Sequence, residues 1–590
     1  MEVTRTFDLL ARLKALYPKN DILAGKKDGV WIKYSTDEYI EHSYNLAYAF
    51  LEMGLKPGDK VITTCQSCPQ WNFIDMGLML AGIIHVPIYT TLSSEDYHYI
   101  IPHSDAKVII LGSESLVRKL TPIINDLPNP PSVYTIDYVE GYQSIANLEE
   151  IGKAQQSKWE TQIKHNVEHA DTEDVATIIY TSGTTGAPKG VMLSHRALAF
   201  VFIGTANWQV IDSRHRMLSF LPLCHVYERS MNYEFQYLGV SIYYAENLGT
   251  IATDLHDIHA DGFCSVPRVL EMMFQKLEAA GKDLRGISKR IYRWAFLLAQ
   301  RYDNVSNPFW FRIQHFVAEK LVYVKWREKL GGHSMTIVTG GSSIQPRIIR
   351  LFSAAKLNIF EGYGLTETAP VIAVNNPKDR ILKIGTVGKV LDGTEVKIAE
   401  DGEILVRGPL LMSGYYKDPE YTKQVIDSEG WFHTGDVGEF VEEIFLKITD
   451  RKKEIFKLSS GKYIAPQVIE NKLKESSFIG NVMVIGENQK VASAIIVPNF
   501  VQLHSWASQQ GLSFADDNAL ISLPETILLI NKEVEKINKN LAFHEQIRKP
   551  RLVTDEWTPL NGFLSQTLKL KRAVLSQHYA SLIHEIYKSE

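Results

Sequence analysis

Short apolar segments alternate with longer amphipathic segments along much of this chain. The runs "KVITTC", "AKVIILG", "VATIIYT" and "MTIVTGG" have the length and composition of buried strands, and helical patterns separate them. Residues 37–64 form one such unit: an amphipathic helix that ends near Gly54, a turn, and then a buried strand. This alternation predicts an α/β fold built from layered α/β subdomains.

The chain is long enough for more than one domain, because 590 residues exceed what one ordinary core accommodates. Residues 380–450 contain short β-like pieces between Gly and Asp turns, which predicts a small β subdomain. After Asp450 the charge-dense "RKKEIFKLSSGKYIAP" reads as a linker. We therefore predict a large N-terminal domain at 1–450 and a smaller, mobile α+β domain at 451–590.

One helix is expected inside the C-terminal domain, in "SLPETILLINKEVEKINKNLAF". Ser522 and Glu525 match the capping-box pattern. Apolar residues follow at spacings of three and four, which predicts a face that packs on its own domain. They are Ile527, Ile530, Val534, Ile537 and Leu541.

The charge balance argues against a nucleic-acid partner. With 63 basic and 68 acidic residues the net charge is −5, so any phosphate ligand is expected to be a small molecule. Four cysteines cannot form a disulfide framework, and Cys65 and Cys68 lack a second pair to complete a zinc site. A reducing, cytoplasmic location fits this cysteine usage.

The N-terminus lacks the uninterrupted apolar core of a signal peptide. No later segment approaches the roughly 18 apolar residues of a membrane span, so we expect a soluble protein. Leu9, Leu10, Leu13 and Leu16 form a helical stripe, which is more often core than membrane anchor. Peripheral membrane contact stays open.

The segment "YTSGTTGAPKGVMLSH" at 180–195 resembles a phosphate-binding loop. Its glycines allow the backbone to turn tightly and approach a ligand. A Walker A loop needs Gly before its Lys and Ser or Thr after it, whereas here Pro188 precedes Lys189 and Gly190 follows it. The P-loop NTPase interpretation therefore fails, and another nucleotide chemistry is expected.

Three further segments accompany this loop: "EGYGLTET" (361–368), "GWFHTGD" (430–436) and "DRKKEIFKLSSGKYIAPQVIE" (450–470). Together the four motifs resemble the adenylate-forming superfamily of acyl-CoA synthetases, nonribosomal peptide adenylation domains and luciferases, from about residue 30 to 575. The resemblance implies that ATP converts a carboxylate to an acyl adenylate with loss of pyrophosphate, and that a thiol then displaces AMP. The glycine loop would clamp the leaving pyrophosphate.

The same resemblance assigns roles within the motifs. Tyr363 would stack on adenine, and Thr366 would hydrogen-bond the α-phosphate. Glu367 would bind Mg²⁺, with Thr181 completing the shell.

Other residues would bind the nucleotide. Asp436 would accept hydrogen bonds from the ribose hydroxyls, and Arg451 would reach the same sugar. The loop and backbone positions that the resemblance adds to the nucleotide site are Ser182, Gly183, Thr184, Thr185, Gly186, Lys189, Gly340, Gly341, Ser342, Glu361 and Gly362.

Three C-terminal positions are implied to act in the change between the two steps. Lys453 matches the hinge, and Gly461 lies in the segment that the family inserts toward the thioester site. Lys569 matches the lysine that bridges the carboxylate and the α-phosphate. The common motif there is Thr-Pro-Ser/Thr-Gly-Lys, and here Gln566 replaces Pro and Leu568 replaces Gly. Because Lys569 must leave before CoA can reach the same carbonyl, a domain swing is expected.

The acid is predicted to be a long-chain fatty acid. "SFLPLCHVYERS" and "CSVPRVLEMM" resemble the long-chain fatty acyl-CoA synthetase branch, which puts His225 beside the substrate carboxylate. Arg268 is either a structural ion-pair partner or catalytic, and Trp208 is either a tunnel gate or core. No convincing Asp is present to hold an amino acid's ammonium group.

These features predict an enzyme, an AMP-forming long-chain fatty acid:CoA ligase that uses ATP, Mg²⁺ and CoA. Two alternatives remain: a ligase that loads a separate carrier protein, and a catalytically silent nucleotide- or lipid-binding homologue. Acyl chain length and oligomeric state stay open.

Overall fold

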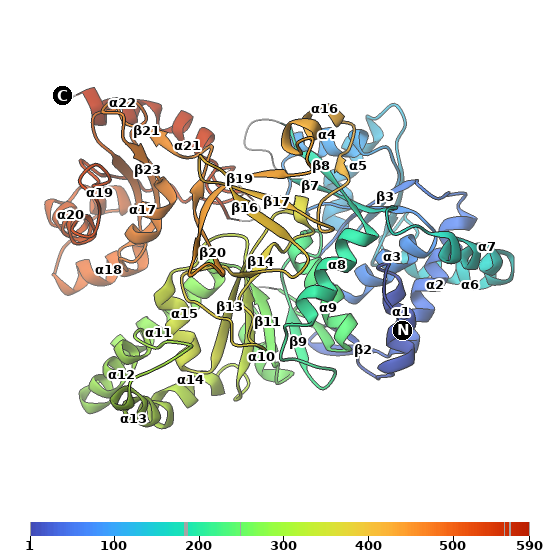
Figure 1. Cartoon of the computed structure of the whole chain (residues 1–590), viewed down its shortest axis with the longest axis horizontal. Coiled ribbons are helices and arrows are strands. Elements are labelled where there is room, and N and C mark those ends of the chain that lie inside the picture. Colours follow the sequence, from blue (N-terminus) through green and yellow to red (C-terminus); the bar gives the residue numbers. More distant parts are fainter. Residues whose placement is uncertain (1, 182–186, 248, 560, 566–567, 589–590) are drawn as a thin grey trace. The chain divides into compact units, whose positions relative to one another are not determined.

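The computed structural model describes residues 2–181, 187–247, 249–559, 561–565 and 568–588 (Figure 1). They form two compact units. Unit 1 comprises the chain up to Val396 with Val406–His433 and Glu442–Leu446, and unit 2 comprises Lys397–Leu405, Thr434–Val441 and the chain from Lys447 on. The predicted site residues Ser182, Gly183, Thr184, Thr185 and Gly186 lie outside the described residues.

The first sheet of unit 1 has seven strands. In spatial order they are β18 (Gly414–Tyr415), β8 (Lys189–Ser194), β7 (Val175–Thr181), β4 (Ile84–Pro87), β3 (Lys60–Thr64), β5 (Ala106–Leu111) and β6 (Ser132–Thr135). Strands β7, β4, β3, β5 and β6 run parallel, while β8 is antiparallel to β7 and to β18. Its helices are α2 (Thr36–Glu52), α3 (Pro69–Leu80), α4 (Ser94–His103), α5 (Glu114–Asn125), α6 (Ile145–Ala154) and α7 (Gln156–His169).

The second set of strands in unit 1 is mostly parallel. In spatial order it contains β15 (Gly388–Val390), β14 (Ala373–Val374), β13 (Leu357–Tyr363), β12 (Met335–Thr339), β11 (Gly262–Ser265), β9 (Arg216–Ser219), β10 (Ser241–Tyr244), β1 (Leu23–Lys27) and β2 (Val30–Tyr34). Strands β13 to β1 in this order are parallel, and β2, β14 and β15 are antiparallel to their neighbours.

The remaining helices of unit 1 flank these strands. They are α1 (Asp8–Leu16), α8 (His195–Ala206), α9 (Val226–Leu238), α10 (Ile251–Asp257), α11 (Pro267–Asp283), α12 (Gly286–Ala299), α13 (Phe309–Ala318), the π-helical η1 (Glu319–Tyr323), α14 (Val324–Glu328), α15 (Pro346–Ala354), the 3₁₀ turn η2 (Thr366–Thr368) and α16 (Pro419–Val425). Helices α8 and α9 pack on each other; α8 contacts β8 of the first sheet, and α9 contacts β9 and β10. This pair therefore joins the two layers of strands.

Local sequence explains the α2–β3 unit. Ser35 and Glu38 form a reciprocal capping box at the start of α2, and Gly54 has φ +83° just beyond its end. The predicted helix, turn and strand are thus confirmed.

The stretch 380–450 contains short strands, as expected of its Gly and Asp turns. Four of them are neighbours in the order β16 (Glu395–Ile398), β17 (Glu403–Arg407), β19 (Phe432–Val441) and β20 (Phe445–Arg451). The boundary between the two units falls inside each of these four strands.

The C-terminal part of unit 2 is α+β. Its strands are β21 (Phe456–Lys457), β22 (Tyr463–Ile464), β23 (Ile479–Ile485), β24 (Ser493–Pro498) and β25 (Arg551–Leu552). Its helices are α17 (Pro466–Leu473), α18 (Phe500–Gln509), α19 (Asp517–Ser522), α20 (Pro524–Asn538), α21 (Arg572–His578) and α22 (Ala580–Lys588). Buried side chains from β23, β24, α17 and α20 form one core, and α21 and α22 contribute to a second.

The predicted capping box at Ser522 is wrong. Ser522 is the last residue of α19, and α20 begins at Pro524 with Leu523 as its N-cap. Proline suits the first helical position, because an N–H at that position has no partner within the helix. Pro524 therefore sets the start of α20, in place of the cap predicted at Ser522. The expected packing face of this helix is only partly buried: Ile530, Val534 and Leu541 are buried, whereas Ile527 is exposed.

The apolar stripe near the N-terminus belongs to the core. Leu9, Leu10 and Leu13 are buried in α1, and Leu16 is half exposed. No helix among the described residues combines the length and the apolar character needed to cross a bilayer.

Candidate active site

Strands β7 and β8 hold the two ends of the glycine loop. Thr181 is the last residue of β7 and Lys189 the first of β8, and the antiparallel register pairs them directly. Both side chains are half-buried. The hairpin therefore presents a hydroxyl and an ammonium at the same end of the sheet.

Two tyrosines surround the Lys189 ammonium. Its Nζ lies 3.0 Å from the ring centroid of Tyr421 and 5.5 Å from that of Tyr415. Cation–π attraction at such distances orients a flexible lysine. Neither tyrosine was predicted, because "SGYYKDPEY" resembles an ordinary turn followed by a short helix.

Tyr415 also connects Lys189 to the "EGYGLTET" segment. Its hydroxyl donates to Glu367 Oε1 at 2.8 Å, and the Met412 N–H donates to the Glu367 carbonyl at 2.9 Å. Burial, together with the Glu367 charge, raises the pKa of Tyr415 well above its ordinary value, so it stays a donor. Thr366 and Glu367 both lie in η2, which contacts β8. The structure thus gathers Lys189, Thr366 and Glu367 at one place.

The Glu367 carboxylate suits Mg²⁺. Glu367 uses Oε1 to accept the Tyr415 hydrogen bond, and its second oxygen is a hard donor of the kind that Mg²⁺ prefers. No group of three His, Cys, Asp or Glu side chains resembling a metal site is found in the part of the chain that the structure describes. The absence of such a group among the described residues fits a Mg²⁺ ion held largely by substrate phosphates, with Glu367 as a protein ligand.

Strands β12 and β13 position the next predicted group. They are parallel neighbours, with Thr339 opposite Glu361, so Gly340, Gly341 and Ser342 leave β12 beside the Glu361–Tyr363 end of β13. Gly341 has φ +82°, which favours glycine.

Glu361 is a buried carboxyl group, with only 6% of its surface exposed. Its Oε1 accepts a long hydrogen bond from the Ile344 N–H at 3.4 Å. Burial raises the pKa of Glu361 to about 8, so the neutral form dominates at neutral pH.

Gly364 was missed by the sequence prediction. A Cβ at this position would lie 1.5 Å from the Pro370 carbonyl oxygen, so no other residue fits without moving the backbone. The glycine in "GYGLTET" therefore allows η2 to fold back against β13.

His225 is the N-cap of α9. Its Nδ1 accepts from the Tyr227 N–H at 3.1 Å, which fixes the orientation of the half-buried ring. A nitrogen that accepts a hydrogen bond carries no proton, so the other nitrogen is the donor of the neutral ring.

A fully buried ion pair holds α9 in place. The Arg229 guanidinium donates to Asp75 Oδ1 in α3 at 2.5 Å and to Thr177 Oγ1 in β7 at 2.6 Å. Asp75 also lies 2.6 Å from His85 Nδ1. The strand that ends at Thr181 and the helix that His225 caps are thus fixed relative to each other.

The structure shows the surroundings of Arg268 and Trp208, for which the sequence left two alternatives each. Arg268 forms an ion pair with Glu271 at 3.4 Å, which agrees with the structural alternative. Trp208 is buried, and the Lys389 ammonium lies 5.1 Å from its ring centroid. A gating role for Trp208 stays a prediction.

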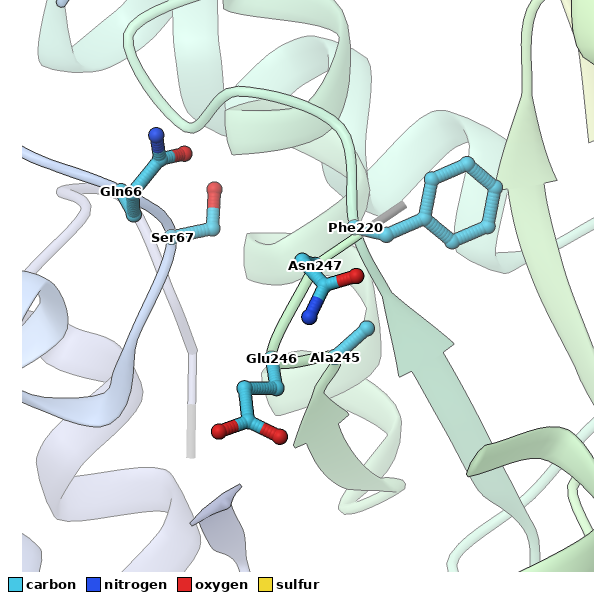
Figure 2. Close-up of a pocket in the computed structure, with 6 residues that line it drawn as sticks. All are labelled: Gln66, Ser67, Phe220, Ala245, Glu246 and Asn247. Carbon is cyan, nitrogen blue, oxygen red and sulfur yellow. The ribbon is translucent and has the colours of Figure 1, made fainter. Parts of the chain in front are cut away.

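A small hollow lies at the ends of β3, β9 and β10 (Figure 2). Figure 2 shows Gln66 and Ser67 on one side of it and Phe220 and Asn247 on the other. The Ser67 hydroxyl donates to the Leu221 carbonyl at 2.7 Å, within "SFLPLCHVYERS". The hollow encloses about 50 Å³, far below the ~300 Å³ of small ligand pockets, so it is too small by itself to hold a long acyl chain.

Asp436 and Arg451 meet in unit 2. Arg451 Nε lies 3.1 Å from Asp436 Oδ1, and Asp436 is almost fully buried. The two side chains predicted to reach one ribose are therefore neighbours on β19 and β20. Lys452 was not predicted; it forms ion pairs with Asp401 at 2.6 Å and Glu403 at 2.8 Å.

The predicted hinge residue Lys453 is exposed in the turn that follows β20. Gly461, with φ +84°, lies in the turn between β21 and β22. Both residues thus lie in turns, and their roles stay predictions.

Lys569 is hydrogen-bonded to Ser565. The Ser565 N–H donates to the Lys569 carbonyl at 2.7 Å, and the Lys569 N–H donates to Ser565 Oγ at 3.1 Å. Leu568 has φ +61°, a left-handed conformation that favours glycine. The backbone therefore keeps the conformation that suits the Gly of the common motif, although the residue is Leu.

Comparison with known families decides the identity. Residues 14–416 match the family described as AMP-binding enzyme, and residues 453–590 match the AMP-binding enzyme C-terminal domain. The chain belongs to the AMP-binding enzyme family.

Two curated relatives cover more than nine-tenths of the chain. The long-chain-fatty-acid–CoA ligase FadD15 of Mycobacterium bovis is 31% identical over 571 residues, covering 95% of this chain and 94% of the relative. The peroxisomal long chain acyl-CoA synthetase 6 of Arabidopsis thaliana is 30% identical, over 92% of this chain and 80% of the relative.

Solved structures of AMP-binding enzymes share the fold. The adenylation domain of a carboxylate reductase from Mycobacterium chelonae superposes with a TM-score of 0.76 at 22% identity, over 99% of this chain and 91% of that one. The anthranilate CoA ligase AuaEII, in complex with anthranoyl-AMP, gives a TM-score of 0.73 at 17% identity, over 99% and 100%. The α/β class with a large and a smaller domain is confirmed.

Proposed function

We propose that this chain is an ATP-dependent, AMP-forming long-chain fatty acid:CoA ligase. The observation that carries the proposal is identity of about 30% across more than nine-tenths of the chain to relatives named long-chain ligases. The grouping of Lys189, Thr366 and Glu367 around Tyr415, and of Asp436 with Arg451, supports it.

In the first step a carboxylate oxygen attacks the α-phosphorus of ATP, and the bond from that phosphorus to the pyrophosphate oxygen breaks. Both reactants are anions, so positioning and charge neutralisation supply most of the acceleration. Lys189, oriented by Tyr421, would neutralise the departing pyrophosphate, and Thr366 would donate to the α-phosphate. Glu367 and Thr181 would hold Mg²⁺, which would supply further positive charge.

In the second step the CoA thiolate attacks the acyl carbonyl, and the bond to the AMP oxygen breaks. The thiol proton leaves to solvent or to a base, and AMP departs with the electron pair of that bond. His225 has a fixed ring orientation at the start of α9, and we assign it to the substrate carboxylate. Lys569 serves the first step, and Lys453 and Gly461 serve the change to the second.

Exchange of labelled pyrophosphate into ATP tests the first half-reaction. We expect exchange that depends on a long-chain fatty acid, because only reversible adenylation returns pyrophosphate to ATP. Turnover with CoA is then compared with turnover on a phosphopantetheinylated carrier protein. Exchange without CoA turnover would favour the carrier-loading alternative, and no exchange with any acid would favour the silent homologue.

A further inference from the structure

The helical segment 282–329 exposes an unusual amount of apolar surface. Phe309 is 69% exposed, Trp310 72% and Phe316 60%. Other large apolar side chains exposed in this segment are Ile287, Leu297, Val305, Ile313, Val317 and Leu321. We call this the α12–α13 surface; the two helices pack on each other, and Figure 1 shows them at one end of unit 1. Single exposed apolar residues are ordinary, but several large ones on two helices that pack together are typical of an interaction site.

Helix α13 is apolar on both faces. Phe311, His315 and Ala318 turn inward, and Tyr302 and Tyr323 have ring contacts with His315. The outward face carries Phe309, Ile313, Phe316 and Val317, at the i, i+4, i+7 and i+8 spacing of a single stripe. Its own domain covers only the inward face, so the outward apolar stripe fits a second apolar environment.

Positive charge accompanies the apolar stripe. Within 282–329 ten exposed residues are basic and two, Asp283 and Glu328, are acidic, although the whole chain has a net charge of −5. The basic residues are Lys282, Arg285, Lys289, Arg290, Arg293, Arg301, Arg312, Lys320, Lys325 and Lys329.

The charges are arranged beside the apolar side chains. Arg290, Arg293, Leu297 and Arg301 follow one another at spacings of three, four and four, which places them along one side of α12 and its extension. In the following helices Lys320 extends its ammonium to 4.6 Å from the Phe316 ring centroid. Long basic side chains of this kind keep their stems on apolar material and their charges at its edge.

We propose that the α12–α13 surface docks on a lipid bilayer that carries anionic headgroups. Exposed Phe and Trp side chains bury in the boundary between headgroups and acyl chains, and Arg and Lys bind lipid phosphates. The charge complementarity favours a bilayer over a second copy of this chain, because two such surfaces facing each other would bring twenty cations together. The docked enzyme would sit where free fatty acids partition.

Sedimentation of the full-length protein with sucrose-loaded vesicles tests this directly. We expect binding to vesicles of equimolar phosphatidylcholine and phosphatidylglycerol, and weak binding to phosphatidylcholine alone. The combined changes Phe309→Ser, Trp310→Ser and Phe316→Ser lower the partition coefficient at least about 10-fold. The combined changes Arg290→Gln, Arg293→Gln and Arg301→Gln lower it about 10²-fold at low salt, since each cation near an anionic surface contributes about one factor of five.

Two matched variants control for loss of exposed apolar groups and of charge elsewhere. The first control combines Tyr138→Ser, Val501→Ser and Phe543→Ser. It removes three apolar side chains that lie outside the α12–α13 surface and are at least as exposed as Phe309, Trp310 and Phe316. Lys27→Gln with Lys33→Gln and Lys56→Gln removes three exposed cations of unit 1. Both controls should bind vesicles like the unchanged protein.

Three results would overturn the proposal: protein that stays in the supernatant with both vesicle types, site variants that bind like the controls, or a dimer that dissociates in the serine variant without any vesicle binding. If the serine variant fails to fold, as judged by its unfolding midpoint, the glutamine variant decides alone. Vesicle binding requires no turnover, so this test can fail while pyrophosphate exchange succeeds.

Discussion

Glu361 carries a carboxyl group into the protein interior at the end of β13, where the neutral form is favoured. Its pKa is raised from an ordinary 4.5 to about 8. Between these values the native state binds more protons than the unfolded state. The stabilising contribution of this group is therefore fully present below about pH 4.5 and is lost as the pH rises through about 8.

We predict that Glu361→Gln removes this pH dependence. Between pH 5 and 8 the unfolding free energy of the unchanged protein should fall relative to that of the variant by up to about 1.4 kcal/mol per pH unit. Urea unfolding at several pH values measures the difference, with the exposed Glu328→Gln as control. Parallel pH profiles for Glu361→Gln and the unchanged protein would contradict the raised pKa.

Lys569 is the residue assigned to the first half-reaction alone. Lys569→Ala should slow pyrophosphate exchange by about 10²- to 10³-fold, the usual effect of removing one electrostatic contact to a transition state. Thioester formation from supplied acyl adenylate should stay within a few-fold. Lys571→Ala, two residues along, is the control. Equal loss of both half-reactions in Lys569→Ala would show that the assignment is wrong.

At the scale of elements, α9 depends on an ion pair that no solvent reaches. Arg229 and Asp75 are completely buried, as is the His85 ring beside Asp75, and Arg229 also bonds to Thr177. Removing one partner of a buried ion pair leaves the other charge uncompensated.

Arg229→Met should therefore lower the unfolding free energy by about 3–5 kcal/mol. Adding Asp75→Leu should recover part of that loss, because no lone carboxylate then remains. Thermal or urea unfolding of the two variants gives the comparison. If the two substitutions lowered the unfolding free energy independently, the double variant would be less stable than Arg229→Met. That result would argue against coupling between Arg229 and Asp75.

The elements differ in how far sequence could predict them. Helix α2 and strand β3 follow from local signals, since Ser35, Glu38 and Gly54 mark the ends and burial follows the apolar pattern. The predicted start of α20, with Ser522 as its cap, was wrong because Pro524 takes the first helical position. The motif residues of the site were found by resemblance. The residues that were missed contact partners far along the chain: Tyr415 contacts Glu367, Tyr421 contacts Lys189, and Lys452 contacts Glu403. Only tertiary structure brings such pairs together.

At the scale of the whole molecule, the two half-reactions are expected to need different positions of the C-terminal domain. Lys453 stands in the exposed turn after β20, where a change in backbone dihedrals is sterically easy. Lys453→Pro fixes φ near −65° and removes the N–H. We expect it to retain pyrophosphate exchange while lowering thioester formation by at least about 10²-fold, of the order seen when reacting groups are misplaced.

Lys453→Ala is the matched control, because it removes the same side chain and leaves the backbone free. Single-turnover measurements separate the two half-reactions in each variant. Thioester formation by Lys453→Pro at the rate of Lys453→Ala would exclude a hinge at this residue.

The central claim is that the chain couples long-chain acids to CoA. It is tested most directly by pyrophosphate release from ATP with acids from acetate to a C20 fatty acid, each with and without CoA. We expect a maximum at long chains that CoA stimulates, with acyl-CoA and AMP formed in equal amounts. Slow release that CoA leaves unchanged, or a maximum at acetate or an aryl acid, would contradict it.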